Sequence, residues 1–473
     1  MSVSNTNLGA AGIAAALQGK KRIWFIGIGG VHMAAIALAC RRRGFAVAGS
    51  DLCDSPRLQQ LAKKGIPVYI GQDPERVKEF DAAVYTLAIS PEDPEYLAAI
   101  GQGMPVFSRA DFLSFLVGDY ARRIGVAGSH GKSTVTAMLS EIFVAEQRFP
   151  TVFCGAELPR VGGTSLVGKG EDCIFEACEY GDSFLAFSPT VSLLLNVEMD
   201  HTDYFSNLDA LVRSFAAFAA APGTLGTVLY NAEDENCVSA VADSPAHKFS
   251  FGLTRGDCHA VHLQYVNGKG KFLLCLMDRI CGEVQLSVMG EHNVKNALAA
   301  ALCASLSGIP TNVILQALSH FKGAARRMEY RGMHRGVCYY DDYAHHPTEV
   351  SATLSTLRTL CGKEGRLFAV FQPHTYTRTA AFFEEFCRAL RLADHVLVAD
   401  IYPARETDTL GMSAALLAEG IGTRAEYVGD DRAIAAALRD KTQPGDTVAV
   451  MGAGNIDAIF AEILPKDFTL SKK

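Results

Sequence analysis

The sequence predicts an α/β protein of three consecutive domains, and three observations support this prediction. The chain has 473 residues, which at roughly 150 residues per domain gives about three domains. Short apolar runs alternate with helical patterns, as in parallel sheets covered by helices. Glycine-rich turns follow two of these runs, at the edge where such sheets bind ligands. We expect the domains to span residues 1–120, 121–332 and 333–473.

The first domain has the pattern of a Rossmann-like, doubly wound sheet. Ile23–Ile28 is a mostly apolar run in a glycine-rich context, and Val31–Arg43 has a helical pattern. Further short strands are expected at Ala46–Gly49, Val68–Ile70, Ala82–Thr86 and Val106–Phe107. Because strands and helices alternate, a parallel sheet is predicted.

The central domain has the order of elements found in P-loop ATPases. A strand at Arg123–Ala127 leads into a glycine-rich turn and a helix from Lys132 to Glu146. Further strands are expected at Cys173–Ala177, Val191–Asn196 and Thr227–Tyr230. The less regular stretch Leu273–Leu286 is compatible with antiparallel strands, and a helix over Asn293–Leu306 closes the domain.

The third domain is again predicted to be Rossmann-like. Its strands are expected at Val337–Tyr340, Leu367–Phe371, His395–Val398 and Thr447–Met451, with helices between them. This completes the predicted series of Rossmann-like, P-loop ATPase-like and Rossmann-like domains.

Composition and charge exclude several classes of protein. Hydrophobic residues make up 49% and charged residues 20%, as in ordinary globular proteins. The net charge of −7, from 44 Lys+Arg against 51 Asp+Glu, disfavours nonspecific binding to nucleic acid or to anionic membranes. This net charge is compatible with a local basic pocket for a phosphorylated small molecule.

The cysteines and the apolar runs indicate a cytoplasmic protein. None of the 13 cysteines falls in a Cys-x-x-Cys pair, so neither a zinc site nor a secreted disulfide framework is expected. Free thiols fit a reducing cytosol. Residues 1–21 lack the charge order of a signal peptide, and no apolar run reaches 18 residues.

A glycine-rich stretch between a strand and a helix indicates ATP binding. It consists of Gly128, Ser129, His130, Gly131, Lys132, Ser133 and Thr134. In a P-loop of this kind the lysine reaches the β- and γ-phosphates and the following hydroxyl ligates Mg²⁺. Val126 stands where the usual spacing has its first glycine, so the alternative is a chance Gly-Lys-Ser turn. The flanking strand and helix favour the phosphate loop.

Acidic and imidazole groups follow two strands of the same sheet. Glu176 lies at the end of one strand, and Asp200 and His201 follow another. Such groups near a phosphate loop favour a Mg²⁺ site, since both lie at strand C-terminal ends. The alternative is an acidic loop in water.

The first glycine loop indicates a pyrophosphate site. It consists of Gly27, Gly29 and Gly30, and Asp51 lies 24 residues beyond the first glycine (51 − 27). His32 occupies the place of a third glycine, so NAD is not specifically indicated. Any diphosphate at a helix N-terminus, such as that of a UDP-sugar, fits the same pattern.

Four further clusters have both a structural and a functional interpretation. Asn293 and Asn296 share one helical face, but Asn293 alone would be explained as a helix N-cap. Arg326-Arg327 lies at a domain boundary and would otherwise be a solvated pair. Residues 341–347 and 372–378 follow strands of the third domain. Polar clusters at several strand ends indicate one cleft shared between domains.

These motifs together resemble those of the Mur ligase family over about residues 23–459. The family loop Gly-Thr-His-Gly-Lys-Thr is similar to residues 128–133, Glu-Ala-Asp-Glu-Ser-Asp to 176–181, and Asn-Ile-Glu-x-Asp-His to 196–201. Residues 292–296, 326–327, 341–347 and 372–374 also look like family signatures. Cys178, Tyr180 and Gly181 depart from the second motif, whereas Glu176 is retained.

The resemblance, closest to the L-alanine-adding members, implies an ATP-dependent ligase of peptidoglycan precursor synthesis. ATP would phosphorylate the carboxylate of UDP-N-acetylmuramate, and the amine of L-alanine would attack the acyl phosphate. ADP and phosphate would leave. The implied partners are these small molecules, with no nucleic acid and no membrane, and the implied assembly is a monomer or weak homodimer.

The resemblance also implies roles for individual residues. Implied catalytic residues are Lys132, His201 and Arg327. Implied Mg²⁺ ligands are Ser133, Glu176 and His201. Implied ATP-binding residues are those of the loop 128–134 together with Asn293, Asn296, Arg327 and Asp342. Implied UDP-sugar contacts are Gly27, Gly29, Gly30, Ser50 and Asp51. Implied amino-acid contacts are His374 and Arg378.

Three alternatives remain at this point. A sister ligase would recycle murein peptides or add another amino acid. A nicotinamide-dependent oxidoreductase would use the first glycine loop, but the missing third glycine and the P-loop count against it. A third alternative is a nucleotide-binding regulator without catalysis. Five retained residues count against it: Lys132, Ser133, Glu176, His201 and Arg327.

Overall fold

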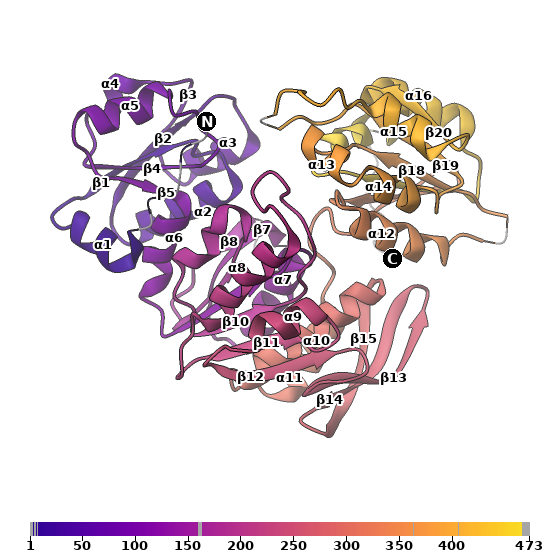
Figure 1. Cartoon of the computed structure of the whole chain (residues 1–473), viewed down its shortest axis with the longest axis horizontal. Coiled ribbons are helices and arrows are strands. Elements are labelled where there is room, and N and C mark those ends of the chain that lie inside the picture. Colours follow the sequence, from indigo (N-terminus) through magenta and orange to yellow (C-terminus); the bar gives the residue numbers. More distant parts are fainter. Residues whose placement is uncertain are drawn as a thin grey trace.

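The structure, a computed structural model, describes residues 3, 6, 8–158, 163–362, 364–404 and 406–465. Within these ranges the strands form three sheets, of five, ten and six strands. Figure 1 shows each sheet in its own lobe, with the central lobe between the N-terminal lobe and the C-terminal lobe. The predicted class of three consecutive α/β domains is confirmed.

The first sheet is parallel throughout and has the order β3-β2-β1-β4-β5. Its strands are β1 (Arg22–Ile26), β2 (Ala46–Asp51), β3 (Val68–Ile70), β4 (Ala82–Tyr85) and β5 (Val106–Ser108). Its helices are α1 (Gly9–Ala16), α2 (Val31–Arg42), α3 (Pro56–Lys63), α4 (Pro74–Val77), α5 (Pro94–Gly101) and α6 (Arg109–Gly118). This is the doubly wound order of a Rossmann-like domain.

The second sheet has the order β15-β14-β13-β12-β11-β10-β6-β9-β7-β8. Its strands are β6 (Arg122–Ala127), β7 (Thr151–Leu158), β8 (Gly163–Leu166), β9 (Asp172–Glu176), β10 (Val191–Leu194), β11 (Thr227–Asn231), β12 (His247–Gly252), β13 (Cys258–Val266), β14 (Lys269–Leu276) and β15 (Arg279–Met289). Its helices are α7 (Lys132–Ala145), η1 (Tyr180–Ala186), α8 (Leu208–Ala220), α9 (Glu235–Val241), α10 (Glu291–Leu306) and α11 (Thr311–His320). Strands β13, β14 and β15 pair antiparallel, as the stretch Leu273–Leu286 suggested.

The third sheet has the order β16-β17-β21-β18-β19-β20. Its strands are β16 (Glu329–His334), β17 (Val337–Asp342), β18 (Leu367–Phe371), β19 (His395–Ala399), β20 (Ala425–Gly429) and β21 (Thr447–Met451). Its helices are α12 (Pro347–Arg358), α13 (Tyr376–Ala381), α14 (Phe383–Leu390), α15 (Ala414–Ile421), α16 (Asp431–Lys441), η2 (Ile456–Ile459) and α17 (Phe460–Ile463). Only the β16–β17 pair is antiparallel among these described strands.

The sequence missed strands that lie toward the sheet margins. β8, β16 and β20 stand at edges, and most of their residues are half-buried or exposed, so they carry no continuous apolar run. β16 pairs with β17, so the chain enters the third sheet at Glu329, before the expected boundary at 332. Asp341 and Asp342 end β17 rather than follow it.

One helix start differs from the sequence interpretation. α10 begins at Glu291, and its N-cap is Gly290 with φ of +94°. The N-capping explanation of Asn293 is therefore wrong, because that residue lies inside the helix and is buried. The Asn293 side chain instead donates a hydrogen bond to the Met289 carbonyl and accepts one from the Asn296 side-chain amide.

The sheets are held by apolar cores on both faces. In the first sheet, Ile23 and Phe25 pack on one side and Trp24 and Ile26 on the other. A strand buried on both faces is a continuous apolar run, which is why the sequence revealed it. Across the described residues, no helix combines the length and apolar character needed to cross a membrane.

Candidate active site

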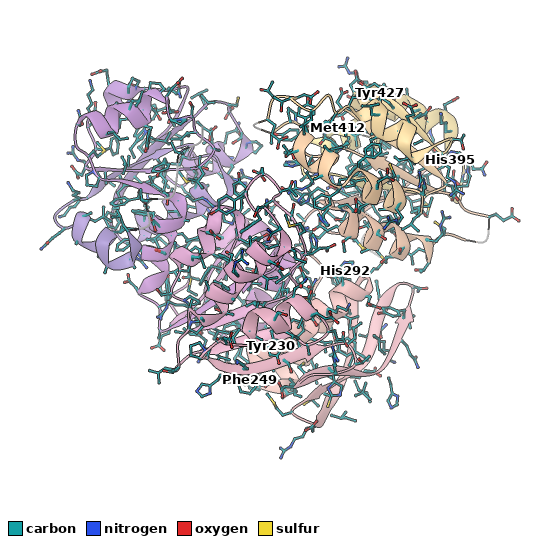
Figure 2. All side chains as sticks on the ribbon, in the orientation of Figure 1. Tyr230, Phe249, His292, His395, Met412 and Tyr427 are labelled. Atoms are coloured by element: carbon teal, nitrogen blue, oxygen red, sulfur yellow. The ribbon has the colours of Figure 1, made fainter. Side chains whose placement is uncertain are left out.

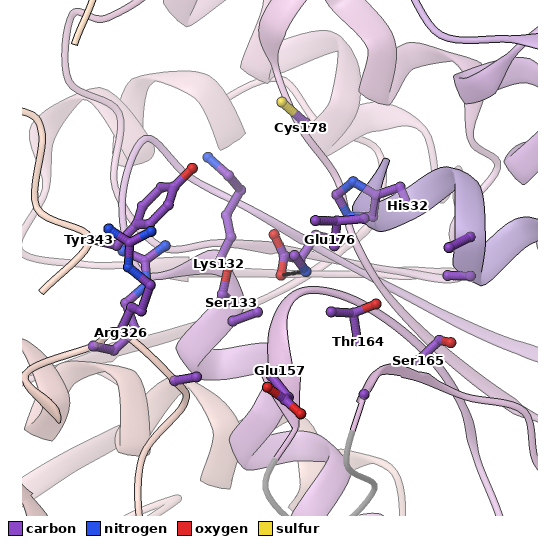
Figure 3. A pocket seen from close by; sticks show the side chains of 18 of the residues that line it. His32, Lys132, Ser133, Glu157, Thr164, Ser165, Glu176, Cys178, Arg326 and Tyr343 are labelled. Atoms are coloured by element: carbon purple, nitrogen blue, oxygen red, sulfur yellow. Dashed lines mark hydrogen bonds between the residues drawn. The ribbon is translucent and has the colours of Figure 1, made fainter. Parts of the chain in front are cut away.

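A cavity of about 1000 Å³ lies where the three domains meet. Residues of α2 and α3, the phosphate loop, the end of β9 and the segment before β16 line it. In Figure 3, His32 lies on one side, Arg326 and Tyr343 on the other, and Lys132 and Glu176 between them. The phosphate loop is therefore the central wall of a cavity that all three domains share.

The phosphate loop is shaped by glycines in conformations that other residues rarely adopt. Gly128 has φ of +149° and Gly131 has φ of +85°. A Cβ atom at Gly131 would lie 2.7 Å from the Asn296 side-chain oxygen, so a larger residue would displace the Asn296 side chain. The loop ends at the N-terminus of α7, where helical N–H groups favour phosphate.

Lys132 is held at the loop by a buried carboxylate. Its Nζ atom lies 3.0 and 3.1 Å from the two carboxylate oxygens of Glu179 and donates to the Ser129 carbonyl at 3.2 Å. Burial opposes the charged form of Lys132, but the nearby groups Glu179, Cys178 and Glu176 together outweigh burial, and the pKa of Lys132 is raised. Glu179 was not singled out from the sequence.

The three implied Mg²⁺ ligands converge on the large cavity. Ser133, Glu176 and His201 all line it. The Glu176 carboxylate accepts a hydrogen bond from the Gly155 amide, and a Cβ at Gly155 would lie 3.0 Å from it. His201 has a positive φ of +52°, a strained conformation for a side-chain-bearing residue. A hydroxyl, a carboxylate and an imidazole facing phosphate space fit a Mg²⁺ ion bound together with nucleotide.

A second cavity of about 330 Å³ lies behind the phosphate loop. Predicted residues lining it are Thr134, Asn293, Asn296 and Asp342, and both cavities share His130, Gly131 and Arg327. Asn296 donates to the Asn293 side-chain oxygen at 3.2 Å, and Asn293 donates to the Met289 carbonyl at 2.7 Å. Burial raises the pKa of Asp342 to about 6, although Thr353 donates to it. In Figure 2, His292 of the same wall stands where the central and C-terminal lobes meet.

The two arginines at the domain boundary are fixed differently. The Arg326 guanidinium donates to the carbonyls of Gly452 and Gly454, at 2.7 and 2.9 Å. Arg327 lies over the Tyr343 ring, 4.9 Å from its centroid, and its Nη1 atom is 3.8 Å from Glu349. Arg326 is thus anchored inside the third domain, whereas Arg327 faces both cavities.

Arg378 makes a buried ion pair across the domain boundary. Its Nη2 and Nε atoms lie 2.9 and 3.0 Å from one carboxylate oxygen of Asp200, and His374 lies 3.1 Å from Nη1. Burial and the neighbouring Arg378 lower the pKa of His374 to about 4. His374 and Arg378 line neither of the two cavities, although Asp200 lines the large one.

The first glycine loop is closed by Asp51, whose carboxylate accepts from the Gly29 amide at 2.9 Å. Gly27 has φ of +77°. Ser50 is buried and its hydroxyl donates to Glu95, so its side chain points into the domain. Gly27, Gly29, Gly30, Ser50 and Asp51 line neither of the two cavities. The cavity wall is instead made by the start of α2 and by α3.

The sequence missed two cations of this wall. Arg57 and Lys64 line the large cavity from α3 and its C-cap. Arg57 donates to the Gly29 carbonyl at 2.7 Å, which ties it to the glycine loop. No motif marks such cations in sequence, because their position depends on how α3 packs beside α2.

His130 joins the phosphate loop to the third domain. Its Nε2 atom lies 3.2 Å from Glu198, and its Nδ1 atom lies 3.1 Å from Glu349 of α12. Burial opposes protonation, but Glu349 and Glu198 outweigh it and raise the pKa of His130 to about 9. Glu198, His346 and Glu349 were not assigned roles from the sequence.

This network predicts a pH dependence of stability. A histidine whose folded pKa exceeds its unfolded value stabilises fully below about pH 6.5, and this stabilisation is lost as the pH rises through 9. The shift corresponds to at most about 3 kcal/mol. The measurement is the urea concentration at the midpoint of unfolding, with EDTA present. The difference in this midpoint between wild type and His130→Gln should shrink as the pH rises from 6.5 to 10. A constant difference would contradict the ion-pair assignment, and the exposed-site variant His320→Gln is the matched control.

Three α/β domains around a phosphate-loop cavity define a nucleotide-binding enzyme of three domains. Family models match the chain in succession: the Mur ligase family catalytic domain over residues 22–121, the Mur ligase middle domain over 126–304, and the Mur ligase glutamate ligase domain over 326–454. The chain belongs to the Mur ligase family.

Individual relatives extend over nearly the whole chain. The UDP-N-acetylmuramate–L-alanine ligase of Caldicellulosiruptor bescii is 39% identical over 450 residues, which cover 94% of this chain and 98% of that protein. The solved UDP-N-acetylmuramate-alanine ligase MurC of Thermotoga maritima has a TM-score of 0.79 at 25% identity, covering 94% and 98%. A murein peptide ligase from Psychrobacter arcticus shares the fold, with a TM-score of 0.71 at 24% identity and the same coverage of both chains.

Proposed function

We propose that the protein is an ATP-dependent ligase that joins L-alanine to the carboxylate of UDP-N-acetylmuramate and releases ADP and phosphate. The observation that carries this proposal is the single cavity lined by Lys132, Glu176, His201 and Arg327 and walled by all three domains. The similarity to UDP-N-acetylmuramate–L-alanine ligases over 94% of the chain supports the choice of substrates. The alternatives of an oxidoreductase and of a regulator have no comparable support.

The charges of the cavity suit phosphoryl transfer to a carboxylate. A carboxylate that attacks a γ-phosphate meets like-charge repulsion, so cations must stand beside both groups. Lys132 supplies one such charge at the loop, and Arg327 supplies another where the two cavities join. The resulting acyl phosphate then reacts with the alanine amine, and phosphate leaves.

Mg²⁺ is proposed as the cofactor that accompanies ATP. Ser133, Glu176 and His201 would hold it, and the ion would neutralise phosphate charge. Glu176 is preoriented by the Gly155 amide, which leaves its other oxygen for a ligand. This supports a role for Glu176 although Cys178 and Tyr180 depart from the family motif.

The proposal assigns one substrate to each of the three domains. We assign UDP-sugar binding to residues 1–120, ATP binding to 121–332 and amino-acid binding to 333–473. The UDP-sugar assignment is supported by the start of α2 and by Arg57 of α3, which is tied to the first glycine loop. The ATP assignment is supported by the cavity that Asn293 and Asn296 line. Arg378 and His374 support the third. We also propose a cytoplasmic monomer or weak homodimer that binds neither nucleic acid nor membranes.

A panel of amino-group substrates tests the proposal. Purified protein would receive ATP, Mg²⁺ and UDP-N-acetylmuramate with L-alanine, glycine, L-serine or the tripeptide L-Ala-γ-D-Glu-meso-diaminopimelate. Phosphate release that requires UDP-N-acetylmuramate and is fastest with L-alanine is expected. Release with the tripeptide but not with L-alanine would replace the proposal by a murein-peptide-recycling ligase. Nicotinamide oxidation or reduction, followed by absorbance, would point to the oxidoreductase instead.

A further inference from the structure

Two histidines and a carboxylate from two domains meet beside the phosphate loop. They are His130 of the loop, Glu198 after β10, and His346, the N-cap of α12. One ligand atom from each lies within 4.8 Å of the other two. This cluster is separate from the implied Mg²⁺ ligands Ser133, Glu176 and His201.

The donor set favours a borderline transition metal over Mg²⁺. Two imidazoles and one carboxylate are the ligands of many three-residue Zn²⁺ sites, which leave a fourth position for water. Mg²⁺ prefers oxygen ligands and retains several waters. The His130 and His346 ring centroids are 4.7 Å apart, so a modest approach of the rings would bring both to one ion.

The outer shell of a metal site is also present. The His130 Nδ1 atom lies 3.1 Å from Glu349, while its Nε2 atom faces Glu198 at 3.2 Å. Metal-bound histidines commonly donate their other N–H to a carboxylate, which orients the ring and makes it a better ligand. Thr348 donates to the second Glu198 oxygen and fixes that carboxylate.

The contacts of the cluster are compatible with a bound cation. The carboxylates of Glu198 and Glu349 flank His130 on its two ring nitrogens, and a divalent ion would take the place of the proton between the His130 Nε2 atom and Glu198. His346 must give up one long hydrogen bond, either to the Met199 carbonyl at 3.2 Å or from the Thr348 amide at 3.4 Å.

We propose that His130, Glu198 and His346 form a binding site for Zn²⁺ or a similar divalent transition metal, which cross-links the phosphate loop to the C-terminal domain. Because the ion would join two domains, it opposes their separation. On the proposed function, substrates bound by three domains require such separation for exchange, so the ion would inhibit turnover.

Binding is tested first, without substrates, so that it does not depend on the proposed function. Co²⁺ is the probe, because four-coordinate Co²⁺ absorbs strongly in the visible range, and Zn²⁺ should displace it. Wild type is expected to bind one Co²⁺ with this spectrum and without the near-ultraviolet band of thiolate ligation. A thiolate band would assign the binding to cysteines and overturn the proposal.

Two ligand variants locate the site. His346→Asn keeps an N-cap side chain, and Glu198→Gln keeps a hydrogen-bond acceptor, so both are expected to fold as wild type. Each should weaken Co²⁺ binding at least roughly tenfold. The matched control is His320→Asn, which removes an exposed histidine of α11 and should bind as wild type. Equal affinity in wild type and both ligand variants would overturn the proposal.

Inhibition is tested second, with Mg²⁺-ATP and substrates present. Zn²⁺ is expected to inhibit phosphate release by wild type, and His346→Asn should need at least tenfold more Zn²⁺ for the same inhibition. Equal sensitivity of both proteins would refute the cross-link as the cause of inhibition. An inactive protein that still binds Co²⁺ at this cluster would refute the proposed function and leave the metal site standing.

Discussion

Replacing Lys132 with alanine should lower kcat for phosphate release roughly 10³-fold, since one preorganised charge at a transferring phosphoryl group contributes about this much. Lys132 lies at the start of α7 and is held by Glu179 beside the phosphate loop. The measurement is phosphate release at saturating substrates. Full turnover by this variant would disprove the phosphate-loop assignment.

Replacing Lys132 also leaves the buried carboxylate of Glu179 without its partner, which lowers stability. A second variant separates this loss of stability from the loss of activity. Only 1% of the Glu179 side chain is exposed, and removing one partner of a buried ion pair costs about 3–5 kcal/mol of stability. The double variant Lys132→Ala/Glu179→Gln should regain most of this stability and remain inactive. Activity that returned with stability would show that Lys132 has only a structural role.

Replacing Arg378 with alanine should raise KM for L-alanine about 100-fold, with KM for ATP changed less than about twofold. A charge-assisted pair lost from a buried site costs about 2–5 kcal/mol, and each 1.4 kcal/mol is about tenfold in an equilibrium constant. Arg378 is only 8% exposed and is aligned by Asp200 of the central domain. Initial rates at varied L-alanine and varied ATP measure the two constants.

Two further variants serve as controls for the Arg378 substitution. Arg378→Lys keeps the charge but loses the planar fork, so an intermediate KM for L-alanine is expected. Arg388→Ala removes an exposed arginine of the neighbouring helix α14 and should change neither constant. An unchanged KM for L-alanine in Arg378→Ala would remove Arg378 from the amino-acid site.

Much of the fold is readable from sequence because its signals are local. β18 and β21 have the predicted bounds, since strands buried on both faces are continuous apolar runs. The glycine-rich loop between β6 and α7 was also recognisable, because its glycines, lysine and hydroxyl lie close together in the sequence. Edge strands such as β8 and β20 carry no comparable pattern, and their pairing partners come from distant parts of the chain.

The ion-pair partners of the charged residues could not be predicted from local sequence patterns. Glu179 lies 47 positions from Lys132, and Asp200 lies 178 positions from Arg378. Asp51 beside Gly29 is the exception, because doubly wound domains repeat that spacing. The same spacing did not predict the orientation of Ser50, whose side chain points into the domain and donates to Glu95.

The sequence by itself determined the class of the protein: three α/β domains, a phosphate loop, and polar clusters where strands end. These features are recognised from the periodicity of apolar residues and from residues that are neighbours in sequence, and both are independent of how the chain packs. Only the tertiary structure decided which clusters meet. The strand order β10-β6-β9 brings the ends carrying Glu198, the phosphate loop and Glu176 together, and α12 then places His346 and Glu349 against the loop. Strand order and domain packing are properties of distant segments, so the metal-binding cluster and the buried ion pairs appear only in the folded chain.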